Sequence, residues 1–73
     1  LIYPNPAEGN LTISLPKFEI FDLRIYDIMG RLVLLEDKIS QTFIISGNTL
    51  SKGSYIIHLS HAKGIITKKL MIE

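Results

Sequence analysis

The side chains best suited to metal chemistry are two histidines near the carboxy terminus. His58 and His61 lie three positions apart, and two imidazoles can hold a metal ion when further ligands join them. On a β-strand, however, an odd spacing directs two side chains to opposite faces. The chain has no cysteine, and no third ligand is in phase with either histidine. The sequence therefore predicts no metal site.

Two catalytic arrangements can be assembled from other polar residues. Ser54, His58 and Asp27 are the residue types of a nucleophile, a base and an orienting acid, but no Gly-x-Ser-x-Gly elbow surrounds the serine. Asp22 and Asp27 lie five positions apart on an expected strand, so they face opposite sides, unlike the paired carboxylates of a glycosidase. We expect no catalytic residues, no cofactor and no enzymatic activity.

Length and charge limit the chain to one small module. It has 73 residues and a net charge of +1, which gives no strong attraction to nucleic acid or to an anionic membrane. The longest apolar run, residues 32–35, is far shorter than the roughly 20 residues that cross a bilayer. We expect no nucleic-acid partner and no membrane insertion. Because the chain begins with Leu1, we expect a single domain over residues 1–73 cut from a larger protein.

Alternating apolar and polar side chains predict short β-strands. The clearest alternation is in residues 19–27, where Phe21, Leu23 and Ile25 share one face. Residues 31–36 follow closely and predict an antiparallel hairpin, with Gly30 at a positive φ. Tyr55 is in phase with a further strand, so we expect its ring in the core. The remaining strands are expected at residues 2–3, 11–15, 42–46, 55–60 and 65–72.

The last strand has no clean alternation, because Ile66, Leu70 and Ile72 share a face with Lys68. A β-bulge would resolve the conflict, and so would an edge position that lets Lys68 reach solvent. No segment shows a sustained helical period. Six or seven strands without helices must cover one sheet with another. The predicted fold is all-β, a small antiparallel β-sandwich that is immunoglobulin-like in build.

Four short segments, in order, resemble the C-terminal sorting domains of the type IX secretion system. The resemblance covers essentially the whole chain. It rests on Tyr3, Pro4, Asn5 and Pro6 with Gly9 after them, on Asp27 to Arg31 as Asp-x-x-Gly-Arg, on Leu50 to Tyr55 as Leu-x-x-Gly-x-Tyr, and on the terminal Lys68, Lys69, Leu70, Met71 and Ile72.

This resemblance implies a sorting signal that directs an upstream cargo through the outer membrane. It implies passage through the periplasm, contact with translocon components, removal by a sortase-like surface peptidase, and a cargo that ends at the cell surface or secreted. The residues expected to contact the machinery are Lys68, Lys69, Leu70, Met71 and Ile72. Those expected to set the turns and the core are Pro4, Asn5, Pro6, Gly30, Gly53 and Tyr55.

The terminal strand also suggests how a partner binds. A receptor can add a strand to an exposed sheet edge, and Lys68 and Lys69 would attract an acidic partner. An edge strand can also support a weak homodimer. The alternative, from another class, is an ancillary β-sandwich of a secreted hydrolase that binds carbohydrate or acts as a spacer. It predicts an exposed planar row of aromatic side chains.

Overall fold

The structure is a computed structural model that describes residues 2–3 and 9–73. This part of the chain forms seven strands and no helix, so it holds no helix that could span a membrane. The prediction of six or seven strands is confirmed. The strands are β1 (Ile2–Tyr3), β2 (Leu11–Ser14), β3 (Phe21–Asp27), β4 (Leu32–Ile39), β5 (Thr42–Ile45), β6 (Gly53–His61) and β7 (Gly64–Ile72).

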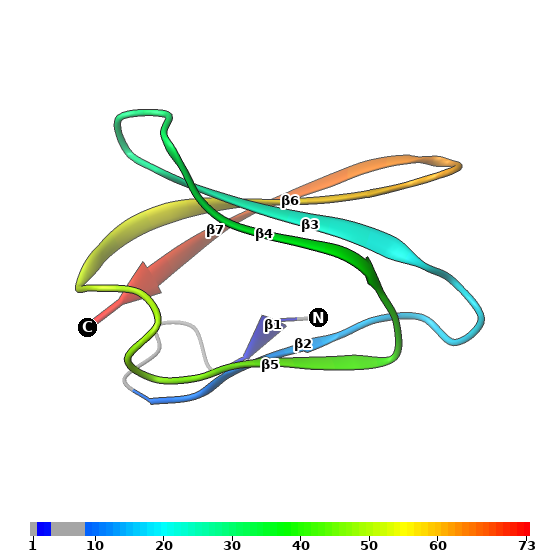
Figure 1. The fold of residues 1–73 in the computed structure, drawn as a ribbon, viewed down its shortest axis with the longest axis horizontal. Helices are drawn as coiled ribbons and strands as arrows, with labels where there is room; N and C mark the ends of the chain where they lie inside the picture. The colour runs from blue at the N-terminus through cyan, green and yellow to red at the C-terminus, as the bar shows by residue number, and fades with distance from the viewer. Residues whose placement is uncertain (1, 4–8) are drawn as a thin grey trace.

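The strands form two antiparallel sheets. One has the order β1-β2-β5, and the other has the order β4-β3-β6-β7. Figure 1 shows the two sheets as separate layers, with the four-stranded sheet above the three-stranded one. Because no helix covers the apolar face of either described sheet, each sheet covers the other. The predicted β-sandwich is confirmed.

The core lies between the layers and follows the alternation in the sequence. Ile13 from one sheet and Leu23, Ile25 and Ile57 from the other are all 0% exposed. Tyr55 is also buried, as its phase predicts. Burying these side chains removes apolar surface from water, which is the main favourable term for a domain of this size. The whole buried cluster is Leu11, Ile13, Leu15, Phe21, Leu23, Ile25, Ile39, Ile45, Leu50, Tyr55, Ile57, Leu59 and Leu70.

Several strand boundaries differ from the predictions. β3 begins at Phe21 rather than at residue 19, and Ile20 before it is 61% exposed. β4 excludes residue 31 and continues to Ile39, because two register shifts against β3 break the alternation without ending the strand. β2 ends at Ser14 and β5 at Ile45, one residue before each predicted end. The β6–β7 hairpin also includes Gly53 and Gly64, which lie outside the predicted strands. Cross-strand pairing keeps these two glycines in the strands although glycine has a low β-strand propensity.

The conflict in the last strand is resolved by its position. β7 pairs with β6 without a register shift, from Gly53 opposite Ile72 to His61 opposite Gly64. Among the described strands, β6 is its only neighbour, so β7 is an edge of the sheet that the structure describes. Lys68 lies opposite the buried Ile57 on the core side of the sheet, yet it is exposed. The edge position, not a bulge, allows a lysine among apolar residues.

Candidate functional site

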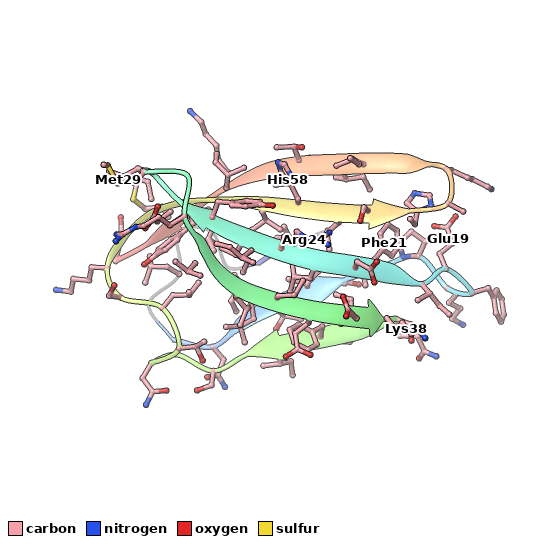
Figure 2. All side chains as sticks on the ribbon, turned by 45° about the horizontal axis from the view of Figure 1, so that its top comes forward. Glu19, Phe21, Arg24, Met29, Lys38 and His58 are labelled. Carbon is pink, nitrogen blue, oxygen red and sulfur yellow. The ribbon has the colours of Figure 1, made fainter. Side chains whose placement is uncertain are left out.

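The two histidines contact different faces of the four-stranded sheet. The His61 ring packs edge-on against buried Phe21, with ring centres 4.5 Å apart. The His58 ring packs in the same way against Tyr26 at 5.1 Å, on the outer face (Figure 2). The predicted opposite orientation is confirmed. The described residues contain no cluster of three side chains that could hold a metal ion.

The residue types of a catalytic triad are not brought together. The Ser54 hydroxyl lies 3.7 Å from the Met71 sulfur, while His58 packs against Tyr26. The Asp27 carboxylate accepts bonds from its own turn. Asp22 accepts a hydrogen bond from the Lys38 backbone N–H at 3.1 Å. Each polar group therefore serves a local structural contact.

The Asp-x-x-Gly-Arg segment forms the turn between β3 and β4. One Asp27 oxygen, Oδ1, accepts hydrogen bonds from the backbone N–H groups of Met29 at 2.9 Å and Arg31 at 3.0 Å. The other, Oδ2, accepts from Arg31 Nε at 2.8 Å. Gly30 has φ 81, a backbone conformation that favours glycine. The motif is thus a hairpin closed by one carboxylate.

We expect Asp27 to make the stability of this turn depend on pH. The Arg31 backbone N–H, which donates to the carboxylate, is the main cause that lowers the pKa of Asp27 below its ordinary value. A pKa that is lower in the folded than in the unfolded chain stabilises the fold above the unfolded value, and the effect is lost as the pH falls through the folded value. Urea midpoints should therefore fall less between pH 6 and pH 3 in Asp27→Ala than in the wild type.

Asp27→Asn is the matched control, because the amide keeps an oxygen acceptor but does not titrate. It should retain more stability than Asp27→Ala at pH 6, and it should also lack the wild-type loss below about pH 4. An equal acid loss in all three proteins would show that the carboxylate is not the titrating group.

The Leu-x-x-Gly-x-Tyr segment builds the entry into β6. The Tyr55 hydroxyl donates to the Ser51 carbonyl oxygen at 2.6 Å, while its ring is buried. Gly53 has φ 147, and Leu50 belongs to the core. These contacts hold the loop before β6 against the sandwich. The predicted turn residues Pro4, Asn5 and Pro6 lie outside the described residues.

The edges of the sheets differ in regularity. In the described part, β1 has two residues and β5 has four. β4 has eight residues but two register shifts, and bulges of this kind discourage edge pairing. β7 has nine residues and no register shift. The terminal strand is therefore the longest regular edge that the structure describes.

The hairpin geometry shows which backbone groups β7 presents. Ala62 and Lys63 form a two-residue turn between the paired His61 and Gly64. The pair that closes such a turn is hydrogen-bonded, so bonding to β6 recurs at every second residue after Gly64. The N–H and C=O groups of Ile65 and Thr67 consequently point away from β6. Alternation alone does not reveal these two residues, because it does not show which backbone groups of a strand remain unpaired.

The five terminal residues divide between the two faces of β7. Lys68 is exposed on the core side, and Lys69 is exposed on the outer face opposite Ile56. Met71 is 44% exposed, whereas Leu70 is 2% exposed and packs in the core. Ile72 is half-buried against that core. The exposed side chains of this segment are those of Lys68, Lys69 and Met71, while Leu70 and Ile72 pack against the core.

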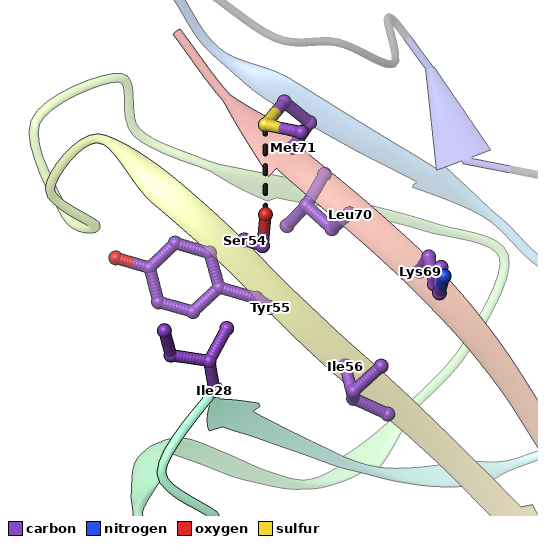
Figure 3. Close-up of a pocket in the computed structure, with 7 residues that line it drawn as sticks. All are labelled: Ile28, Ser54, Tyr55, Ile56, Lys69, Leu70 and Met71. Atoms are coloured by element: carbon purple, nitrogen blue, oxygen red, sulfur yellow. Dashed lines mark hydrogen bonds between the residues drawn. The ribbon is translucent and has the colours of Figure 1, made fainter.

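An open pocket of about 340 Å³ lies beside the end of β7. Figure 3 shows it between the Ile28 turn and the outer faces of β6 and β7. Its lining is mostly apolar and contains no carboxylate or imidazole; it consists of Ile28, Ser54, Tyr55, Ile56, Lys69, Leu70 and Met71. Acid and base groups do not converge there. The surface is suited to binding rather than to catalysis.

Comparisons with known proteins agree with this geometry. A family model described as a secretion system C-terminal sorting domain matches residues 1–73. The chain is 32% identical over 71 residues to beta-agarase D of Zobellia galactanivorans, and the match covers 97% of this chain but 14% of that protein.

A solved structure shares the fold. It belongs to PorZ, an essential bacterial surface component of the type-IX secretion system of Porphyromonas gingivalis. The TM-score is 0.79 at 20% identity, and the match covers 100% of this chain and 11% of that chain.

Proposed function

This chain belongs to the family of secretion system C-terminal sorting domains, and from that premise we propose that β7 is the surface contacted by the translocon. The chain is a sorting signal of the type IX secretion system, and it is not an enzyme. Its relative is an agarase, but the match covers only a small part of that protein. Export to the cell surface or secretion is the outcome that such a signal serves.

The regular edge of β7 is the observation that carries the proposal. A strand of nine residues without a bulge can accept a further strand where its outward backbone groups are open. Main-chain hydrogen bonds then supply affinity, beginning at Ile65 and Thr67. The other described edges are short or bulged. We infer that the translocon binds by strand addition.

The side chains of β7 supply selectivity in this proposal. Lys68 and Lys69 give the strand a positive charge on both faces, which favours an acidic partner and speeds its approach. Leu70 and Ile72 pack against the core, so they fix the register in which the lysines are presented. Met71 adds apolar surface next to the pocket.

The remaining steps belong to the same proposal. An upstream cargo would accompany the domain through the periplasm, and a sortase-like surface peptidase would then remove the domain. The activity of that cargo would lie outside this chain. The proposal is supported by the family match over residues 1–73.

No observation favours the carbohydrate-binding alternative. It predicts a row of exposed aromatic rings. Among the aromatic side chains that the structure describes, Phe18 alone is exposed, and it lies in the loop between β2 and β3. A single ring does not form a platform.

Charge reversal on β7 tests the proposed contact. We expect a reporter fusion carrying Lys68→Glu and Lys69→Glu to be exported roughly tenfold more slowly by a competent host, because electrostatic attraction is replaced by repulsion. The measurement is the reporter fraction outside the cell over time. Lys17→Glu with Lys63→Glu is the matched control, since both lysines are exposed and lie outside β7. Equal rates for the two fusions would contradict the proposal.

A further inference from the structure

The flank of the sandwich formed by β4 and β5 carries an open groove. Among the described strands, β4 ends the four-stranded sheet and β5 ends the three-stranded one. The chain passes directly from β4 in one layer to β5 in the other (Figure 1). The β4–β5 groove has a volume of about 250 Å³, and its lining includes Leu34 and Glu36 of β4 and Phe43 of β5.

The outward edge of β5 has open backbone groups. The Leu15 N–H donates to the Gln41 carbonyl oxygen at 2.6 Å, so these two residues continue the β2–β5 ladder as a hydrogen-bonded pair. Such pairs recur at every second residue of an antiparallel ladder, which directs the backbone groups of Phe43 toward β2. The N–H and C=O groups of Thr42 and Ile44 therefore point away from β2. No other strand in the described part of the chain pairs with β5.

The side chains of the groove define what can bind there. Glu36 lies opposite the buried Leu23, so it is on the core side of the sheet, yet it is exposed. No cation within the described residues forms a salt bridge with Glu36. Leu34, two positions away on β4, and Phe43 of β5 are half-buried against the core. The groove therefore presents a carboxylate without a counter-ion beside apolar side chains.

We propose that the β4–β5 groove binds an extended segment of a partner protein that carries a basic side chain and, two positions along, an apolar one. The segment adds to β5 through the backbone groups of Thr42 and Ile44. Residues two positions apart share a face of a strand, so the basic side chain meets Glu36 while the apolar one packs against Leu34 and Phe43. Because β5 has four residues, main-chain bonds are few and the two side chains supply the selectivity.

A second copy of the chain fits the groove less well than such a segment. Two β5 strands that pair about a two-fold axis would bring residues 42–45, Thr-Phe-Ile-Ile, to each other's groove. This segment contains no basic residue, so Glu36 would be covered without gaining a counter-ion, which is costly. The groove is also at the opposite end of the four-stranded sheet from β7. The inference therefore goes beyond the function proposed for β7.

Two synthetic peptides test the rule. Both are blocked at their ends; one has the sequence Thr-Lys-Thr-Leu-Thr-Leu-Thr, and the other has Glu in place of Lys. Each is titrated into the 73-residue chain while amide NMR signals are recorded. The lysine peptide should shift the signals of Thr42 and Ile44, with a dissociation constant at least about fivefold lower than that of the glutamate peptide. Glu36→Lys should reverse this order.

Asp37→Lys is the matched control, because Asp37 is exposed on the same strand but does not line the groove. It makes the same change of charge, and at about 0.15 M salt, which screens distant charges, the lysine peptide should keep its advantage. Ile44→Pro removes an outward N–H and no bond to β2, and edge strands tolerate proline at such positions. It should weaken binding of the lysine peptide about tenfold. Far-UV circular dichroism checks that each variant is folded.

Three results would overturn the proposal. The first is an equal dissociation constant of the wild type for the two peptides. The second is a set of peptide-induced shifts at Ile65 and Thr67 of β7 in place of those at Thr42 and Ile44. The third is a shift of the Thr42 and Ile44 signals when the chain is concentrated without peptide, which would identify a second copy as the occupant. If Ile44→Pro does not fold, the reversal in Glu36→Lys still decides between the outcomes.

Discussion

Removing residues 68–73 from a reporter fusion should leave the reporter inside the cell, with export no higher than for a reporter without the domain. The deletion removes both lysines from the proposed contact strand. It also removes five of the nine residues of β7 and their pairing with β6, together with the core side chain of Leu70. The measurement is the reporter fraction in the medium and on the cell surface.

Two causes of this loss must be separated, because the deletion affects both contact and folding. Leu70→Ala keeps the lysines but should lower stability by about 2–5 kcal/mol, the usual cost of truncating a buried leucine. The charge-reversed pair at Lys68 and Lys69 keeps the core. Removing only Glu73, which is exposed and follows β7, should leave export unchanged. Normal export after deletion of residues 68–73 would overturn the role of the terminal strand.

Ile57→Ala should be among the most damaging single substitutions to stability. Ile57 is 0% exposed at the centre of the four-stranded sheet, opposite Ile25 on β3 and Lys68 on β7. Truncating a buried isoleucine costs about 2–5 kcal/mol. A domain of this length has roughly 4–11 kcal/mol of total stability, so the variant should lose a large part of it. Urea unfolding of the isolated chain measures the change.

Ile44→Ala is the control for this prediction. Ile44 lies on β5 with 58% of its surface exposed, so its loss should change stability by less than about 0.5 kcal/mol. If Ile44→Ala and Ile57→Ala unfold at the same urea concentration, the two-layer core is not the source of stability.

Alternation in the sequence was sufficient to place most strands and the core. Leu23, Ile25 and Ile57 are buried as their period predicts, because side-chain direction along a strand is a local property. Gly30 at a positive φ follows from turn chemistry in the same local way. The boundaries were less accurate: residue 19 is outside β3, and β4 continues to Ile39. Strand ends depend on the pairing partner, which local sequence does not specify.

The candidate site was likewise predicted from the sequence only in part. The terminal motif predicted contact residues from Lys68 to Ile72, and alternation placed Lys68 on the same face as Leu70, but neither showed which of the two is exposed. Leu70 is buried while Lys68, two positions away on the same face, is exposed. The difference arises because Leu70 packs into the sandwich, whereas Lys68 reaches solvent at the sheet edge.

The amino-acid sequence by itself therefore determined the all-β class, the approximate positions of the strands, the turn glycines and the family. Only the tertiary structure decided that β7 is the long regular edge, that β4 is interrupted by register shifts, and that Lys68 is the exposed centre of that edge. The physical reason is the separation along the chain of the residues that determine each property. Alternation and turn conformation depend on neighbouring residues, whereas the edge of a sheet is defined only by the pairing of all its strands.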